Sequence, residues 1–217
     1  MNKGLSLSFI TVIKDRTNIN VEYNNTIINL KLFENNLRAL IELIEPGDDW
    51  EYIIVDYESK DVNMAEFINS LPKKPNLNFV IYTQKEKFDR GGGLNFGLSK
   101  ATKENTFCLD SDMLIKTREL FNDINTYVVE QNKVLFPICY SYNEPEHLTG
   151  FKRNTGLGMV IQKRDSVIKY VNNKTWGHED LKNYNYYTSK NQAVRTYYGT
   201  NYVHQWHPEE LKHINYK

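Results

Sequence analysis

Short apolar runs rich in β-branched and aromatic residues alternate with helical patterns along most of this chain. The strand-like runs occupy residues 7–14, 51–61, 77–82, 106–110, 133–143 and 156–164. The helical patterns occupy residues 29–47, 64–71, 94–101 and 117–132. Such alternation is typical of a parallel sheet with helices on both faces, because parallel strands need long crossover connections. We therefore predict a Rossmann-like α/β protein, a three-layer α/β/α sandwich with a mainly parallel central sheet.

The size and charge of the chain narrow its class. With 217 residues, 40% of them hydrophobic, one domain over residues 1–217 is expected. Lysine plus arginine and aspartate plus glutamate each number 27, so the net charge is zero, which argues against nucleic-acid binding. Cys108 and Cys139 lie in apolar runs without metal-site spacing and indicate a reducing compartment. No apolar run reaches about 18 residues, so we predict a cytoplasmic protein without a transmembrane segment, with peripheral membrane association still open.

Two aspartates separated by one serine follow the apolar run that ends at Leu109. Side chains two apart on a strand point to the same side, so Asp110 and Asp112 are expected to share a cavity while Ser111 faces away. Hard oxygen ligands at a strand end suit Mg²⁺ or Mn²⁺, which also take phosphate oxygens. The alternative is that Asp-Ser-Asp is ordinary turn chemistry at the end of a strand.

Other polar residues follow the neighbouring predicted strands. Lys14 ends the first strand-like run, Arg16 follows it, and Asp56 ends the apolar part of the second. Arg90 precedes three glycines, which would let a ligand approach the backbone closely, although a flexible turn before a helix explains them equally well. In open α/β sheets ligands bind outside the carboxyl ends of the strands, so these residues are candidates for a binding site.

The order of these motifs resembles that of family 2 glycosyltransferases of the GT-A fold. The segments that carry the resemblance are VIKDR, IIVDYESKD, FDRGGGLNFGLSKA and FCLDSDM. The resemblance implies a half that binds a nucleotide sugar, residues 1–115, and a half that binds the acceptor, residues 116–217. It also implies a set of residues that contact the nucleotide sugar: Thr11, Lys14, Arg16, Asp56, Arg90, Asn95, Asp110 and Ser111.

A second segment, TWGHEDLKNY, is similar to the W-G-x-E-D segment of galactosyl- and N-acetylgalactosaminyltransferases. That resemblance implies that Asp180 is the general base and that Glu179 contacts a sugar. It further implies that Trp176 and Gly177 lie in the acceptor site. The alternative is structural, since an acidic pair in the first turn of a helix is favourable through the helix dipole alone.

Two histidines near the end of the chain, His204 and His207, flank Trp206. Neutral imidazole is a common metal ligand, and the resemblance implies a late histidine in that role beside Asp112 and Asp110. We favour His204, because it ends the apparent strand at residues 200–204, and keep His207 as a candidate. The alternative is a pair of polar surface residues around a packed tryptophan.

Together these features predict a metal-dependent inverting glycosyltransferase. It would use Mn²⁺ or Mg²⁺ and move a hexose such as galactose or N-acetylgalactosamine from a UDP-sugar to a carbohydrate or glycoconjugate acceptor. The sequence is also compatible with two alternatives. One is a metal-dependent nucleotidyltransferase, and the other is a degenerate transferase domain that binds carbohydrate without catalysis.

Overall fold

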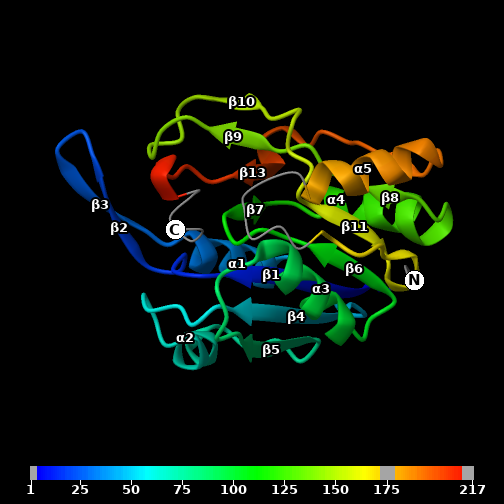
Figure 1. Cartoon of the computed structure of the whole chain (residues 1–217), viewed down its shortest axis with the longest axis horizontal. Helices are drawn as coiled ribbons and strands as arrows, with labels where there is room; N and C mark the ends of the chain where they lie inside the picture. The colour runs from blue at the N-terminus through cyan, green and yellow to red at the C-terminus, as the bar shows by residue number, and fades with distance from the viewer. Residues whose placement is uncertain (1–3, 172–178, 212–217) are drawn as a thin grey trace.

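The computed structural model describes residues 4–171 and 179–211, and its centre is a seven-stranded sheet (Figure 1). The strands of this sheet are β1 (Ser6–Ile13), β4 (Asp49–Asp56), β5 (Leu77–Thr83), β6 (Asn105–Cys108), β8 (Val134–Leu135), β11 (Val160–Lys163) and β12 (Ala193–Val194). Their order across the sheet is β12-β8-β11-β6-β1-β4-β5. Every described pair is parallel except those that β11 makes with β6 and β8. The predicted mainly parallel sheet is therefore confirmed.

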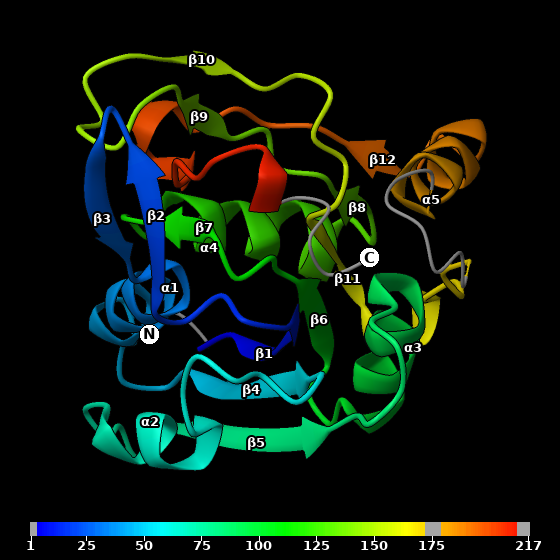
Figure 2. The same ribbon diagram turned by 60° about the vertical axis from the view of Figure 1, so that its left-hand side comes forward.

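Helices cover both faces of this sheet, as predicted. The helical elements are α1 (Leu32–Glu42), α2 (Met64–Ser70), α3 (Arg90–Lys100), α4 (Glu119–Asp123), the π-helix η1 (Ile124–Glu130) and α5 (Glu179–Ser189). Two short 3-10 turns, η2 (Arg164–Ser166) and η3 (Gly199–Asn201), complete them. Phe9 of β1 packs in the core that α1, α2, α4 and η1 share, whereas its neighbour Ile10 packs against α3. Figure 2 shows α3 and α5 at the right of the molecule, with α1 and α2 at the left.

The three glycines after Arg90 are part of a helix and not of a flexible turn before it. Helix α3 begins at Arg90, and its N-terminus is capped by Asp89, which accepts a hydrogen bond from the Gly92 N–H at 2.9 Å. A Cβ atom at Gly93 would lie 2.7 Å from a methyl group of Val12. The glycines therefore let the helix lie directly on the sheet, which brings Arg90 to the strand ends.

A second sheet supplies the other side of the site. It contains β7 (Met113–Ile115), β9 (Tyr140–Tyr142), β10 (Gly150–Lys152) and β13 (Tyr202–His204), in the order β10-β9-β13-β7. The single strand that the sequence predicted over 133–143 is thus two strands, β8 and β9, in different sheets. Strand β13 pairs antiparallel with β7, with His204 opposite Met113, so the end of the chain returns to the Asp-Ser-Asp loop.

A hairpin formed by β2 (Ile19–Tyr23) and β3 (Thr26–Leu30) projects from the body of the molecule (Figure 1). The pattern of apolar residues in the sequence did not predict this hairpin. Asn24 and Asn25 connect its strands with φ angles of 49° and 59°. Asparagine tolerates such positive φ, and a two-residue turn of this kind matches the twist of a hairpin. Among the described residues, no helix is both long and apolar enough to cross a membrane.

Candidate functional site

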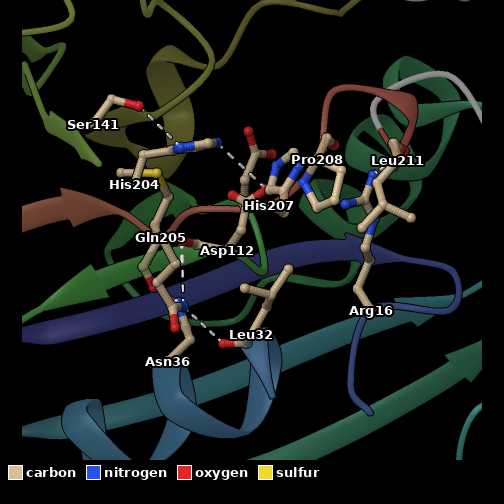
Figure 3. A network of polar contacts seen from close by, with 12 residues as sticks. Arg16, Leu32, Asn36, Asp112, Ser141, His204, Gln205, His207, Pro208 and Leu211 are labelled. Carbon is tan, nitrogen blue, oxygen red and sulfur yellow. Dashed lines mark hydrogen bonds and ion pairs between the residues drawn. The ribbon is translucent and has the colours of Figure 1, made fainter. Parts of the chain in front are cut away.

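Asp112, His204 and His207 meet at one end of the central sheet (Figure 3). Their candidate ligand atoms all lie within 4.8 Å of one another. Asp112 Oδ2 is 3.7 Å from His204 Nε2 and 3.3 Å from His207 Nε2. The sequence favoured His204 as the ligand, but the structure brings both histidines to the same carboxylate. Strand pairing explains why these residues meet. Strand β7 begins directly after Asp112, and β13 pairs with it so that His204 lies opposite Met113.

The surroundings of the two imidazoles fit a cation at their Nε2 atoms. His207 Nδ1 lies 3.0 Å from the Pro208 carbonyl oxygen, an acceptor, so Nδ1 must carry a hydrogen. In the neutral ring, Nε2 then presents a lone pair toward Asp112. His204 Nδ1 is 3.2 Å from the Ser141 hydroxyl. Outer contacts of this kind orient metal-ligating histidines in proteins. A metal ion at this point would be bound by the His207 lone pair and the carboxylate together.

Asp112 is suited to remain ionised at this position. Its side chain is 16% exposed. Burial by itself opposes the charged form, but the neighbouring His204 and His207 hold the pKa of Asp112 well below its usual range. A carboxylate with two imidazoles fits Mn²⁺ better than Mg²⁺, because Mg²⁺ prefers oxygen ligands throughout.

Asp110 faces a different partner, the guanidinium of Arg90. Arg90 Nε and Nη2 lie 3.0 and 2.9 Å from Asp110 Oδ1. The same guanidinium donates from Nη1 to Asp180 Oδ1 at 2.9 Å, and from Nη2 to the Gly158 carbonyl at 3.0 Å. Arg90 therefore joins the first aspartate of the Asp-Ser-Asp loop to the first turn of α5. A role for Asp110 as a metal ligand stays a prediction.

Gly158 lies where these three side chains converge. A Cβ atom at this position would lie 2.9 Å from Arg90 Nη2, 3.0 Å from Asp180 Oδ2 and 3.5 Å from Asp110 Oδ2. The absence of a side chain here leaves room for the cluster. Gly158 has no distinctive signal in the sequence, since an isolated glycine before a strand is a common pattern.

Three of the residues predicted to bind the nucleotide sugar are buried or hydrogen-bonded within the protein. Thr11 is fully buried, and its hydroxyl donates to the Leu109 carbonyl at 2.6 Å. Asn95 exchanges two hydrogen bonds with the backbone of Tyr170, at 2.9 and 2.7 Å. Ser111 is buried, and it lies in the turn between β6 and β7. Contacts of these residues with a nucleotide sugar stay predictions.

The remaining candidates of the first half follow β1 and β4. Lys14 comes directly after β1. Arg16 donates from Nη2 to the Leu211 carbonyl and thereby contacts the end of the described chain. Asp56 is 5% exposed, and burial raises the pKa of its carboxyl. Its Oδ1 accepts a hydrogen bond from the Ser59 N–H at 3.0 Å.

The acceptor segment is described only in part. Glu179 and Asp180 begin α5, so the acidic pair lies in the first turn of a helix. Trp176 and Gly177 lie outside the described residues.

A family model described as "Glycosyl transferase family 2" matches residues 23–205 of the chain. Chondroitin sulfate N-acetylgalactosaminyltransferase 1 from Homo sapiens is 25% identical, over 92% of this chain and 43% of its own length. The protein of the same name from Mus musculus is also 25% identical, over 89% and 44%. The chain thus spans less than half the length of these curated relatives.

Solved structures share the fold at low sequence identity. The complex of S. aureus TarS 1-349 with UDP-GlcNAc has a TM-score of 0.71 and 17% identity, over 97% of this chain and 61% of that one. The mannosyltransferase PcManGT from Pyrobaculum calidifontis, with GDP-Man and Mn²⁺, has a TM-score of 0.68 and 14% identity. That match covers 98% of this chain and 60% of the other.

Proposed function

Because the chain belongs to glycosyl transferase family 2 and is a glycosyltransferase of the GT-A fold, we propose that it moves a hexose from a UDP-sugar to a carbohydrate or glycoconjugate acceptor. The observation that carries this proposal is the Arg90 cluster. Arg90 joins Asp110, which follows β6, to Asp180 on α5. Asp112, two residues after Asp110, pairs with His204. Membership in the family decides against the nucleotidyltransferase alternative.

The donor proposed is a UDP-linked hexose, with N-acetylhexosamines first among the candidates. Two comparisons support this choice. The human relative is named as an N-acetylgalactosaminyltransferase, and TarS was solved with UDP-GlcNAc. The mannosyltransferase structure contains GDP-Man, so GDP-sugars are the natural comparison in a binding assay.

Asp112, His204 and His207 would hold a divalent cation, for which we propose Mn²⁺. The Mn²⁺ in the mannosyltransferase structure supports this choice. Such an ion supplies positive charge for the leaving diphosphate. The protein's own contribution is a ligand set in which a carboxylate and two oriented imidazoles face one point.

Asp180 is the proposed general base. Transfer with inversion requires a group that takes the proton of the acceptor hydroxyl as its oxygen attacks the anomeric carbon. Arg90 binds Asp180 Oδ1 and so fixes the direction in which the carboxylate points. Glu179 precedes the base on the same helix and is proposed to contact a sugar.

Asp180→Asn tests the proposal. The amide keeps the shape of the side chain but cannot accept the proton, so kcat should fall about 10²-fold or more while binding of the donor persists. The measurements are the rate of UDP release with an oligosaccharide acceptor and the thermal shift produced by UDP with Mn²⁺. Normal turnover of this variant would remove Asp180 from the role of base. A shift with GDP but not UDP would overturn the donor class.

A further inference from the structure

Gln205 lies between the two candidate histidine ligands in the chain, and its side chain points away from them into the body of the protein (Figure 3). It is 2% exposed. Its amide nitrogen Nε2 donates to the Leu32 carbonyl at 2.9 Å and to the Asp112 carbonyl at 3.3 Å. Its oxygen Oε1 accepts from Asn35 Nδ2 at 2.9 Å. Both ends of a buried amide are therefore satisfied, and each partner belongs to another segment of the fold.

These partners connect the metal triad, Asp112, His204 and His207, to helix α1. Leu32 and Asn35 belong to the first turn of α1, and Asp112 supplies the carboxylate of the triad. The backbone N–H of Gln205 also donates to the Asp112 carbonyl, at 2.9 Å. One residue thus holds the loop that carries Asp112 and the segment that carries both histidines against the same helix.

The neighbouring residue of α1 supports the other end of the loop. Asn36 is 2% exposed, and its Nδ2 donates to the Met113 carbonyl. The Tyr52 hydroxyl donates to Asn36 Oδ1 at 3.1 Å and also lies 2.7 Å from Thr11 Oγ1. A buried hydrogen-bond network therefore runs beneath the Asp-Ser-Asp loop. Such networks fix geometry when every member is satisfied.

From this arrangement we propose that Gln205 is a positioning residue for the metal site. Its hydrogen bonds hold His204 and His207 at binding distance from Asp112. The proposal rests on the function proposed above, but it concerns metal affinity and not transfer. A ligand set that depends on its support loses metal affinity when the support is removed, by about 10- to 100-fold in known sites. Excess metal compensates for such a loss, since the ligands themselves remain.

Gln205→Leu tests the proposal, because leucine fills much of the space without making either set of hydrogen bonds. We expect the Kd for Mn²⁺, measured by the electron paramagnetic resonance signal of free Mn²⁺ in the absence of donor, to rise about tenfold or more. Turnover at saturating Mn²⁺ should recover to within about threefold of the parent protein, whereas His207→Ala should not recover.

Gln162→Leu is the matched control. Gln162, on β11, is also a buried glutamine and is 1% exposed. Its Oε1 accepts a hydrogen bond from the Tyr187 hydroxyl at 2.6 Å. This variant should lower the Tm while leaving the Kd for Mn²⁺ unchanged. If Gln205→Leu does not fold, Asn35→Ala replaces it, since it removes only the partner of Gln205 Oε1 and should weaken Mn²⁺ binding to a smaller extent.

The outcomes separate this proposal from the proposed function. If the parent protein binds Mn²⁺ and both the Gln205 and Gln162 variants bind it equally well, the positioning role is wrong and the metal site stands. If the parent protein does not bind Mn²⁺, the metal site and the positioning role are both wrong. A Kd that rises only for Gln205→Leu supports the proposal.

Discussion

Replacing Arg90 with methionine removes the guanidinium that contacts both Asp110 and Asp180. The Arg90 side chain is 13% exposed, and the two carboxylates are 37% and 25% exposed. A hydrogen bond to a charged group contributes about 1.5–3 kcal/mol when buried. Because water reaches both carboxylates, the loss should be smaller than the sum of two such bonds. We expect Arg90→Met to lower the free energy of unfolding by about 2 kcal/mol, a discounted value for partly exposed pairs.

That loss has a measurable size. A chain of this length loses about 2–4 °C in Tm for each kcal/mol, so Arg90→Met should melt about 4–8 °C lower. The effect on catalysis should exceed the effect on stability. Without the guanidinium Asp180 is no longer oriented, and a displacement of a catalytic group by about 1 Å costs about 10²-fold in rate. Thermal unfolding and the rate of UDP release from a UDP-sugar with acceptor, both with Mn²⁺, measure the two effects.

Arg118→Met provides a matched control for the loss of a partly buried ion pair. Arg118 is 20% exposed, and its Nη1 lies 2.7 Å from Asp48 Oδ2. Because Asp48 is buried, this variant should lose at least as much stability as Arg90→Met. It lies outside the candidate site, so its kcat below the melting range should stay within about threefold of the parent value. If Arg90→Met retains kcat to the same degree, the orienting role of Arg90 is wrong.

Two further predictions concern stability. Burial raises the pKa of the Asp56 carboxyl, so the folded state binds more protons than the unfolded state, and stability rises as pH falls through that raised pKa. Asp56→Asn should therefore raise the Tm at pH 7. This gain in Tm should shrink as the pH falls from the raised pKa of Asp56 toward the ordinary pKa of an aspartate. A gain that does not depend on pH would contradict the raised pKa of Asp56. Gly97→Ala should lower the Tm, because its Cβ would lie 2.4 Å from a methyl group of Ile10. Overpacking costs about 1–3 kcal/mol and offsets the gain of about 1 kcal/mol in helix propensity; a higher Tm would show that the helix moves freely away from the sheet.

Local sequence patterns determined the layered architecture of this protein and the strand ends at which its candidate site residues lie. The period of apolar residues along each segment is a local property, so the alternating strands and helices, and the aspartates that follow β6, could be read from the sequence alone. Where local signals compete, the sequence was less informative. The Asn24-Asn25 turn specifies a hairpin that the pattern of apolar residues did not reveal, and residues 133–143 form two strands because they belong to two different sheets.

Tertiary structure decided which of these residues act together. Arg90 and Asp180 are separated by 90 positions, and their ion pair depends on how α3 and α5 lie at the strand ends. Similarly, antiparallel pairing of β13 with β7 brings His204 and His207 to Asp112. Gln205 carries no signal in the sequence, because a glutamine between histidines looks like a solvent-exposed residue. It becomes a buried support only when α1, the Asp-Ser-Asp loop and the end of the chain meet, since hydrogen bonds between distant segments follow from register and packing and not from local composition.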